Sequence, residues 1–202
     1  MTFPYDAANG VMYARLYALY ALVPEKMRLF FYDRNGSDCT NFVSQCVWAA
    51  YGGWLPGIEP ENIERNRERI RQHIRFAPFV WYGSPTFTGS NAWCRVVEFF
   101  DYCLQPKANG PKAVKIGEGD WSDIKPSLLK EGDVIQLVVS SYAAYRYGHC
   151  LYVTREGTTW DSVQICCHSI DRMDSPLSEF AYAPKEYPKL RVIRFKDTSF
   201  IK

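Results

Sequence analysis

The chain has 202 residues, which suits one domain with a sizeable hydrophobic core, and we expect a single domain spanning residues 1–202. Hydrophobic residues make up 47% of the chain and charged residues 23%, a globular composition that excludes general disorder. The formal net charge of +2 argues against nucleic acid as a partner. No stretch approaches the ~20 apolar residues of a membrane helix, so no membrane partner is expected.

The N-terminal segment does not resemble an export signal. It lacks a positively charged start, Asp6 and Arg15 interrupt its apolar residues, and no small-residue cleavage site follows. We therefore expect a cytoplasmic protein, or one released by a non-classical route.

Four helices are predicted in the first half of the chain from the helical spacing of apolar side chains, over residues 6–23, 39–51, 61–75 and 90–104. Asp38 is a favourable N-cap residue for the second helix, and Gly52 is a natural stop. The 61–75 helix is rich in arginine and glutamate, and we interpret it as a solvated helix with many i,i+4 charge pairs.

Strands are predicted from residue 130 onward, in the segments EGDVIQLVV, GHCLYVTREG, SVQICCHSI and KLRVIRF. Helices thus come first along the chain and an antiparallel sheet follows. This segregation predicts an α+β fold, with N-terminal helices packed on a C-terminal antiparallel sheet.

Two of the three histidines lie on neighbouring predicted strands. His149 opens one strand and His168 ends the next, so a hairpin would bring them to the same end of the sheet. Side-chain parity complicates this, because a register that buries Cys167 on the face of His149 points His168 to the other face. A bulge is needed if His168 is to reach His149, and Asp171 has the better parity but lies further on. Both stay candidates for a third polar residue of the site.

Cys39 has the setting of an activated nucleophile. It follows Asp38 at the predicted start of a helix, where the dipole favours a thiolate, and a nearby imidazolium would lower its pKa further. His149 would take the thiol proton and return it to a leaving amine, while a third polar group fixes the ring. The backbone N–H of Cys39 would be available to an oxyanion.

Seven cysteines occur, an odd number with no CxxC pair, so neither a disulfide scaffold nor a structural zinc site has a local signature. A zinc site built from Cys39, His149 and either Cys167 or His168 is a weaker alternative. No metal or other cofactor is expected.

The segment GSDCTNFVSQCVWAAYGGW resembles the signature of a bacterial family, the putative amidase domain family. SPTFTGSNAWCRVVEFFDY, EGDVIQL, GHCLYVT and CHSIDRMDSPL resemble its later motifs in the same order, over about residues 5 to 195. The family is similar to the NlpC-type and CHAP-type cysteine peptidases, distant relatives of papain. The resemblance implies a papain-like core with Cys39 as nucleophile, His149 as general base and His168 as the histidine of the closing motif.

Further residues enter through the same resemblance. Asp171 matches an acidic or amide position after the closing histidine, and Tyr32 is a candidate hydroxyl donor to the oxyanion, although a packing aromatic is the simpler interpretation. Asp38 would support the oxyanion site or cap the helix. Asn41 and Gln45 are expected to tie the helix to neighbouring segments by side-chain hydrogen bonds.

The predicted function is thiol-dependent hydrolysis of an amide, with a peptide or peptidoglycan-like substrate and an acyl-enzyme on Cys39. Two alternatives share the same residues. One transfers the acyl group to an amine rather than to water. The other is an inactive module that binds a peptide or a protein partner, although Cys39 together with both histidines favours chemistry.

Overall fold

The computed structural model describes residues 2–24, 38–57, 59–73, 80–83, 89–142 and 145–199. Within these ranges the helices are α1 (Ala7–Tyr17), α2 (Cys39–Ala50), α3 (Pro60–His73), α4 (Asn91–Cys94), α5 (Val96–Leu104) and α6 (Ser178–Ala181), with short 3-10 helices η1 (Tyr20–Leu22) and η4 (Pro126–Leu128). The strands are β1 (Thr2–Phe3), β2 (Lys112–Gly119), β3 (Val134–Val138), β4 (Tyr147–Arg155), β5 (Gln164–Cys167), β6 (Arg172–Pro176), β7 (Leu190–Lys196) and β8 (Thr198–Ser199).

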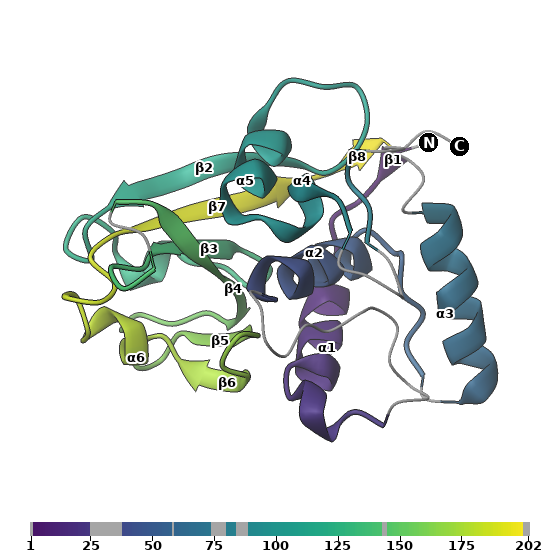
Figure 1. The fold of residues 1–202 in the computed structure, drawn as a ribbon, viewed down its shortest axis with the longest axis horizontal. Helices are drawn as coiled ribbons and strands as arrows, with labels where there is room; N and C mark the ends of the chain where they lie inside the picture. Colours follow the sequence, from purple (N-terminus) through teal and green to yellow (C-terminus); the bar gives the residue numbers. More distant parts are fainter. Residues whose placement is uncertain are drawn as a thin grey trace.

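Six of the described strands form an antiparallel sheet in the order β2-β7-β3-β4-β5-β6, and β1 pairs with β8 in a separate ribbon. Helices α1, α2 and α5 lie against this sheet and α4 packs on α2 and α5, while α6 lies beside β5 and β6 (Figure 1). The predicted α+β fold is confirmed, because the helices precede an antiparallel sheet along the chain.

The two faces of the sheet carry two hydrophobic cores. Side chains that alternate along β3, β4 and β5 point to opposite faces, as strand geometry requires. The face toward the helices carries Val134, Cys150, Tyr152, Cys166 and Ile193. The other face carries Ile135, Leu137, Leu151, Val153, Ile165 and Cys167, covered by Trp121, Leu129, Leu177 and Phe180.

Several predicted boundaries differ from those observed. The 6–23 helix ends at Tyr17 and continues as η1, and the 90–104 helix divides at Arg95, whose backbone is extended with φ −111° and ψ 135°. Strands β2 and β6 were not predicted. The arginine-rich helix is α3, and Asn66, 1% exposed, holds it by hydrogen bonds to both backbone groups of Leu55 at 2.6 and 2.7 Å.

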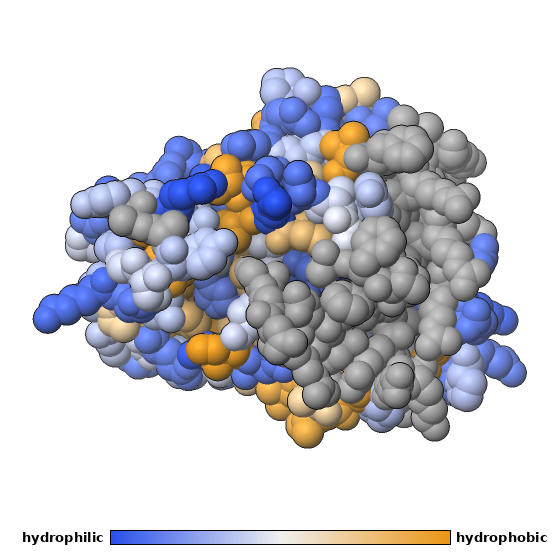
Figure 2. Space-filling model, in the orientation of Figure 1, coloured by the Kyte–Doolittle hydropathy of each residue, from blue (hydrophilic) through white to orange (hydrophobic). Residues whose placement is uncertain are grey.

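Among the described residues, no helix combines the length and the apolar character that crossing a membrane requires. Figure 2 shows one face of the molecule, on which the described residues are coloured by their hydropathy. Apolar side chains are scattered there among hydrophilic ones.

Gly10 marks the closest approach of α1 to the sheet. A Cβ at this buried position would lie 2.0 Å from Oη of Tyr152 and 3.0 Å from the carbonyl oxygen of Cys46. Tyr152 cannot easily retreat, because its hydroxyl is 3.0 Å from that of Tyr5, which donates to the carbonyl of Gly132.

Gly10→Ala is therefore expected to destabilise the protein by about 1–3 kcal/mol through overpacking, although alanine is the better helix former. Urea unfolding measures this difference. Met12→Ala, in the same helix at a position that is 48% exposed, is the control and should change the free energy of unfolding little. A Gly10→Ala variant as stable as the parent would contradict the close approach.

Candidate active site

The thiol of Cys39 lies at the first residue of α2, where this helix packs against β4. Its side chain is only 1% exposed. The sulfur lies 3.8 Å from Oγ1 of Thr40, and Cys150 and His149 of β4 are close enough to it to lower its pKa. The positive end of the α2 dipole and an imidazole therefore meet at one sulfur, the surroundings that favour a thiolate.

His149 stands on β4 opposite Leu137 of β3. The thiols of Cys39 and Cys167 are near enough to its ring to raise its pKa, and the ring centroid is 5.8 Å from that of Phe180. The ring also lines a cleft on the protein surface. It is therefore placed between a buried sulfur on one side and a space open to a ligand on the other.

The electrostatics of this pair favour the charged forms of both groups. The hydrogen bond from Cys150 lowers the pKa of Cys39 well below its ordinary value, burial opposes this, and the charge of His149 adds to the lowering. Burial alone would lower the pKa of His149, but the charge of Cys39 and hydrogen bonds with Cys167 and Cys39 raise it to about 10. A thiolate–imidazolium pair is thus expected from the lowered pKa of Cys39 up to a pH of about 10.

Cys150 supports the ionised sulfur. Its Sγ accepts hydrogen bonds from Oγ1 of Thr40 at 3.4 Å and from Nε2 of Gln136 at 3.2 Å, so its own S–H can donate to Cys39. Gln136 is fixed in turn by Nε of Arg191, which donates to its Oε1 at 2.7 Å. Burial raises the pKa of Cys150 well above its ordinary value, so Cys39 is the thiol of this pair that ionises.

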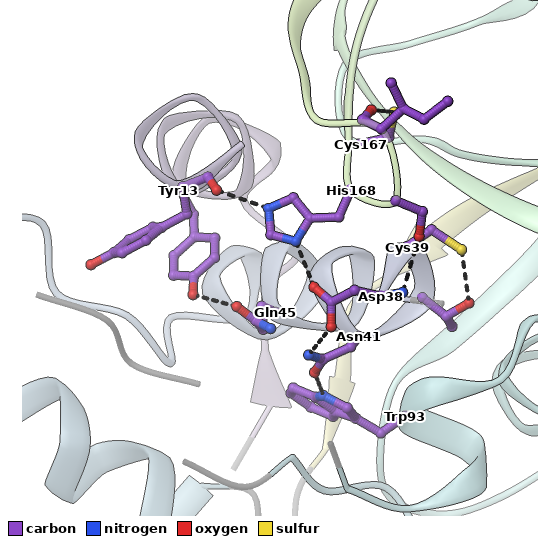
Figure 3. A network of polar contacts seen from close by, with 12 residues as sticks. Tyr13, Asp38, Cys39, Asn41, Gln45, Trp93, Cys167 and His168 are labelled. Carbon is purple, nitrogen blue, oxygen red and sulfur yellow. Dashed lines mark hydrogen bonds and ion pairs between the residues drawn. The ribbon is translucent and has the colours of Figure 1, made fainter. Parts of the chain in front are cut away.

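His168 faces the helices rather than His149, the orientation that side-chain parity predicts. Its Nδ1 is 2.6 Å from Oδ2 of Asp38, and its Nε2 is 2.9 Å from the backbone carbonyl oxygen of Tyr17 (Figure 3). The ring stacks on Phe42 with 4.1 Å between centroids. Because both ring nitrogens have these partners, this structure does not place His168 as the group that orients His149.

The Asp38–His168 contact holds a shared proton inside the protein. A carbonyl oxygen only accepts, so Nε2 of His168 must carry hydrogen toward Tyr17, and a further proton lies between Nδ1 and the carboxyl group. The two side chains are 2% and 1% exposed. Burial raises the pKa of Asp38, and the hydrogen bond with His168 opposes that shift.

Asp38 occupies the N-cap position of α2, but its side chain does not cap the helix as predicted. It instead accepts a hydrogen bond from Nδ2 of Asn41 at 2.8 Å, and Oδ1 of Asn41 accepts one from the Trp93 indole at 2.7 Å. Ser44 donates to the carbonyl of Trp93 at 2.8 Å. The carboxylate therefore fixes the start of α2 through side chains rather than through the helix backbone.

Gln45, near the end of the signature segment, accepts a hydrogen bond from the hydroxyl of Tyr13 at 2.8 Å. Together with Asn41 it ties α2 to neighbouring segments, the structural role expected from the sequence. The polar residues of 38–45 thus serve two purposes: Cys39 and Thr40 lie at the site, and the others anchor the helix that carries them.

Two further sequence candidates are Asp171 and Tyr32. Asp171 lies, half-buried, in the turn between β5 and β6. Tyr32 falls outside the described residues.

A cleft of about 650 Å³ opens beside His149, lined by Val139, Ser141, Tyr142, Gly148, His149, Ser169, Ile170, Arg172, Glu186 and Tyr187. It combines apolar walls with one cationic and one anionic side chain, Arg172 and Glu186. Ser169 connects it to the nucleophile, because its Oγ accepts a hydrogen bond from the backbone N–H of Asp38 at 3.0 Å. The opening is large enough for a segment of a peptide-like ligand.

Comparison with known proteins identifies the family. The family model described as "Putative amidase domain" matches residues 4–191, nearly the whole chain. The chain belongs to this family. No curated protein and no solved structure matches the chain at a significant level. Membership in the amidase domain family indicates amide hydrolysis in general, and the pair formed by Cys39 and His149 lies within the matched region.

In the parts of the amidase domain that the structure describes, no three His, Cys, Asp or Glu side chains are grouped so as to hold a metal ion. Sequence reasoning missed the roles of two other thiols. Cys150 contributes to lowering the pKa of Cys39, and Cys167 contributes to raising that of His149. The parity argument contained the signal for Cys167, since it placed that residue on the face of His149.

Proposed function

We propose that this amidase domain hydrolyses a peptide or peptidoglycan-type amide through a thioester on Cys39, with His149 as the acid and base. The observation that carries the proposal is the packing of α2, which begins at Cys39, against β4, which carries His149, with the pKa of each side chain shifted toward its charged form by the other. Amide hydrolysis requires a nucleophile and a proton donor for the leaving amine, and this pair supplies both.

The chemical steps follow from the geometry. The Cys39 thiolate attacks the amide carbonyl carbon and forms a C–S bond, and the oxyanion develops near the positive end of α2. The C–N bond then breaks as the His149 imidazolium gives its proton to the leaving amine. Neutral His149 next takes a proton from water, whose oxygen attacks the thioester carbon. The C–S bond then breaks, which releases the acid and restores the Cys39 thiolate beside the His149 imidazolium.

A papain-like assignment of the core agrees with the arrangement of elements. The helix that begins at Cys39 packs on an antiparallel sheet, and the neighbouring strand β4 presents His149 to it. We assign His168 and Asp38 as positioning residues, because the contacts of their side chains with each other, with Tyr17 and with Asn41 fix the first turn of α2.

The charge pair predicts selective alkylation of Cys39. Iodoacetamide should label Cys39 at neutral pH faster than any other thiol. This should hold even against Cys94, whose side chain is more exposed than that of Cys39. Reactivity should persist well below the ordinary thiol pKa of ~8.5, since the His149 imidazolium keeps Cys39 ionised there.

Mass-spectrometric mapping of the alkylated residue over a range of pH tests the activated thiolate. In His149→Ala the midpoint of Cys39 labelling should move to alkaline pH. Equal labelling rates for Cys39 and Cys94 in the unmodified protein would contradict the proposed function.

A further inference from the structure

Cys167 lies on the same face of the sheet as His149. The pairing of β4 with β5 sets Tyr152 opposite Cys166 and Val153 opposite Ile165. The next residue of β5, Cys167, therefore falls beside Leu151, on the face that also bears His149 two residues earlier. Cys167 is fully buried.

The sulfur of Cys167 is held from several sides. Sγ lies 3.6 Å from the carbonyl oxygen of Ile170, to which its S–H donates. Arg172 is its direct partner across the β5–β6 pair, and the nearby thiol contributes to raising the pKa of the Arg172 guanidinium. Nε of Arg172 is fixed by Glu179 at 2.7 Å. With its hydrogen directed to Ile170, the sulfur presents lone pairs to any further donor.

His149 can supply such a donor, because the register sets its ring diagonally beside Cys167 on the same face of the sheet, and Cys167 contributes to raising the pKa of His149. An imidazole that serves as a base needs one nitrogen without hydrogen toward the nucleophile, so its other nitrogen needs an acceptor. The two residues first considered for this task, His168 and Asp171, lie elsewhere: His168 is bound to Asp38 and Tyr17, and Asp171 is in the turn beyond β5.

We propose that Cys167 is the positioning residue of His149, its sulfur accepting the N–H of the ring nitrogen that faces away from Cys39. This inference rests on the proposed function and adds to it a thiol as the third member of the site. Arg172 serves it indirectly, by keeping the sulfur of Cys167 in place as an acceptor.

The charged and titratable groups around His149 come from four sides. Cys39 lies on α2, Cys167 on β5, and Arg172, Glu186 and Tyr187 line the same cleft as the ring. Arg172 disfavours an imidazolium, but its pairing with Glu179 offsets that charge. The acceptor at Cys167 favours the imidazolium, so its loss should weaken the charge pair with Cys39.

The experiment measures the alkylation rate of Cys39 by iodoacetamide as a function of pH in four proteins: the parent, Cys167→Ala, Cys167→Ser and Cys166→Ala. In Cys167→Ala the pH at which the alkylation rate of Cys39 is half-maximal should rise by about one pH unit, because one charge-assisted hydrogen bond is lost. Cys167→Ser, which keeps an acceptor, should lie near the parent. Cys166→Ala is the matched control, a buried thiol on the same strand that faces the helices, and it should leave the midpoint unchanged.

The outcomes separate the two proposals. If Cys39 of the parent protein is not selectively alkylated, the proposed function itself fails. If Cys39 of the parent is alkylated with a low midpoint pH, and Cys167→Ala and Cys166→Ala both keep that midpoint, only the role of Cys167 is overturned. Should Cys167→Ala fail to fold, Cys167→Val keeps the volume without an acceptor, and it must show the same rise in the midpoint.

Discussion

Replacing Cys39 by alanine should lower the turnover of peptide amides by about a thousandfold or more, because the proposed acyl-enzyme forms on its sulfur. His149→Ala should cost about as much, since the thiolate loses its counter-ion and the leaving amine loses its proton donor. The double variant should be hardly worse than either single one, because the two residues act as a unit. The measurement is kcat/KM on a panel of peptide p-nitroanilides and muropeptides.

Cys46→Ala is the matched control for this experiment. Cys46 lies in the same helix and is fully buried, and the charge that bears on it comes from Cys166 rather than from His149. The Cys46→Ala variant should therefore keep its turnover. Circular dichroism should show that all four variants, the two single catalytic variants, their double variant and Cys46→Ala, are folded. Turnover retained in Cys39→Ala would exclude the covalent route, and additive losses in the double variant would show that the two side chains act separately.

Removing His168 should give the largest loss of stability. His168→Ala leaves the Asp38 carboxyl buried without its 2.6 Å partner, a change that costs about 3–5 kcal/mol when a charge is left uncompensated. Asp38→Ala should cost a similar amount. Urea unfolding of both variants and of the double variant gives the coupling energy, which should be large because the pair is in direct contact.

The loss of folding stability in His168→Ala should depend on pH. Burial already raises the pKa of Asp38, and the lost hydrogen bond had opposed that shift, so the pKa rises further in the variant. The folded variant then binds a proton more tightly than the unfolded chain, and its stability falls as pH rises above the ordinary carboxyl pKa of ~3.9. Asp171→Asn is the control, and a similar loss of stability there would contradict the special role of the buried pair.

Local patterns in the sequence were enough to predict part of the fold and part of the candidate site. Helical spacing after Asp38 located the helix that carries Cys39, and alternation along 147–155 located the strand that carries His149. Alternation also indicated that Cys167 and His168 face opposite ways. The resemblance to the amidase family favoured His168 as a catalytic residue, but a motif records only that a residue matters, not which neighbour it touches.

The remainder depends on contacts between distant segments. Asp38 and His168 are 130 positions apart in the chain, so no local pattern pairs them. Strand β2 was missed because its burial alternates poorly, and β6 because it is short and mixed in polarity. The division of the predicted 90–104 helix at Arg95 likewise follows from tertiary packing, since Gln136 of β3 donates to the carbonyl of Val96 there at 2.8 Å.

The order of the strands has a consequence for aggregation. An open sheet exposes unpaired backbone groups along its outermost strands, and here these are β2 and β6. Each is poorly suited to accept a strand from another molecule. The pairing of β2 shifts between Lys115 and Gly117, and that of β6 shifts opposite residues 165–167, while Pro176 ends β6 without a backbone donor. The two register shifts and the proline thus protect the folded protein against edge-to-edge association.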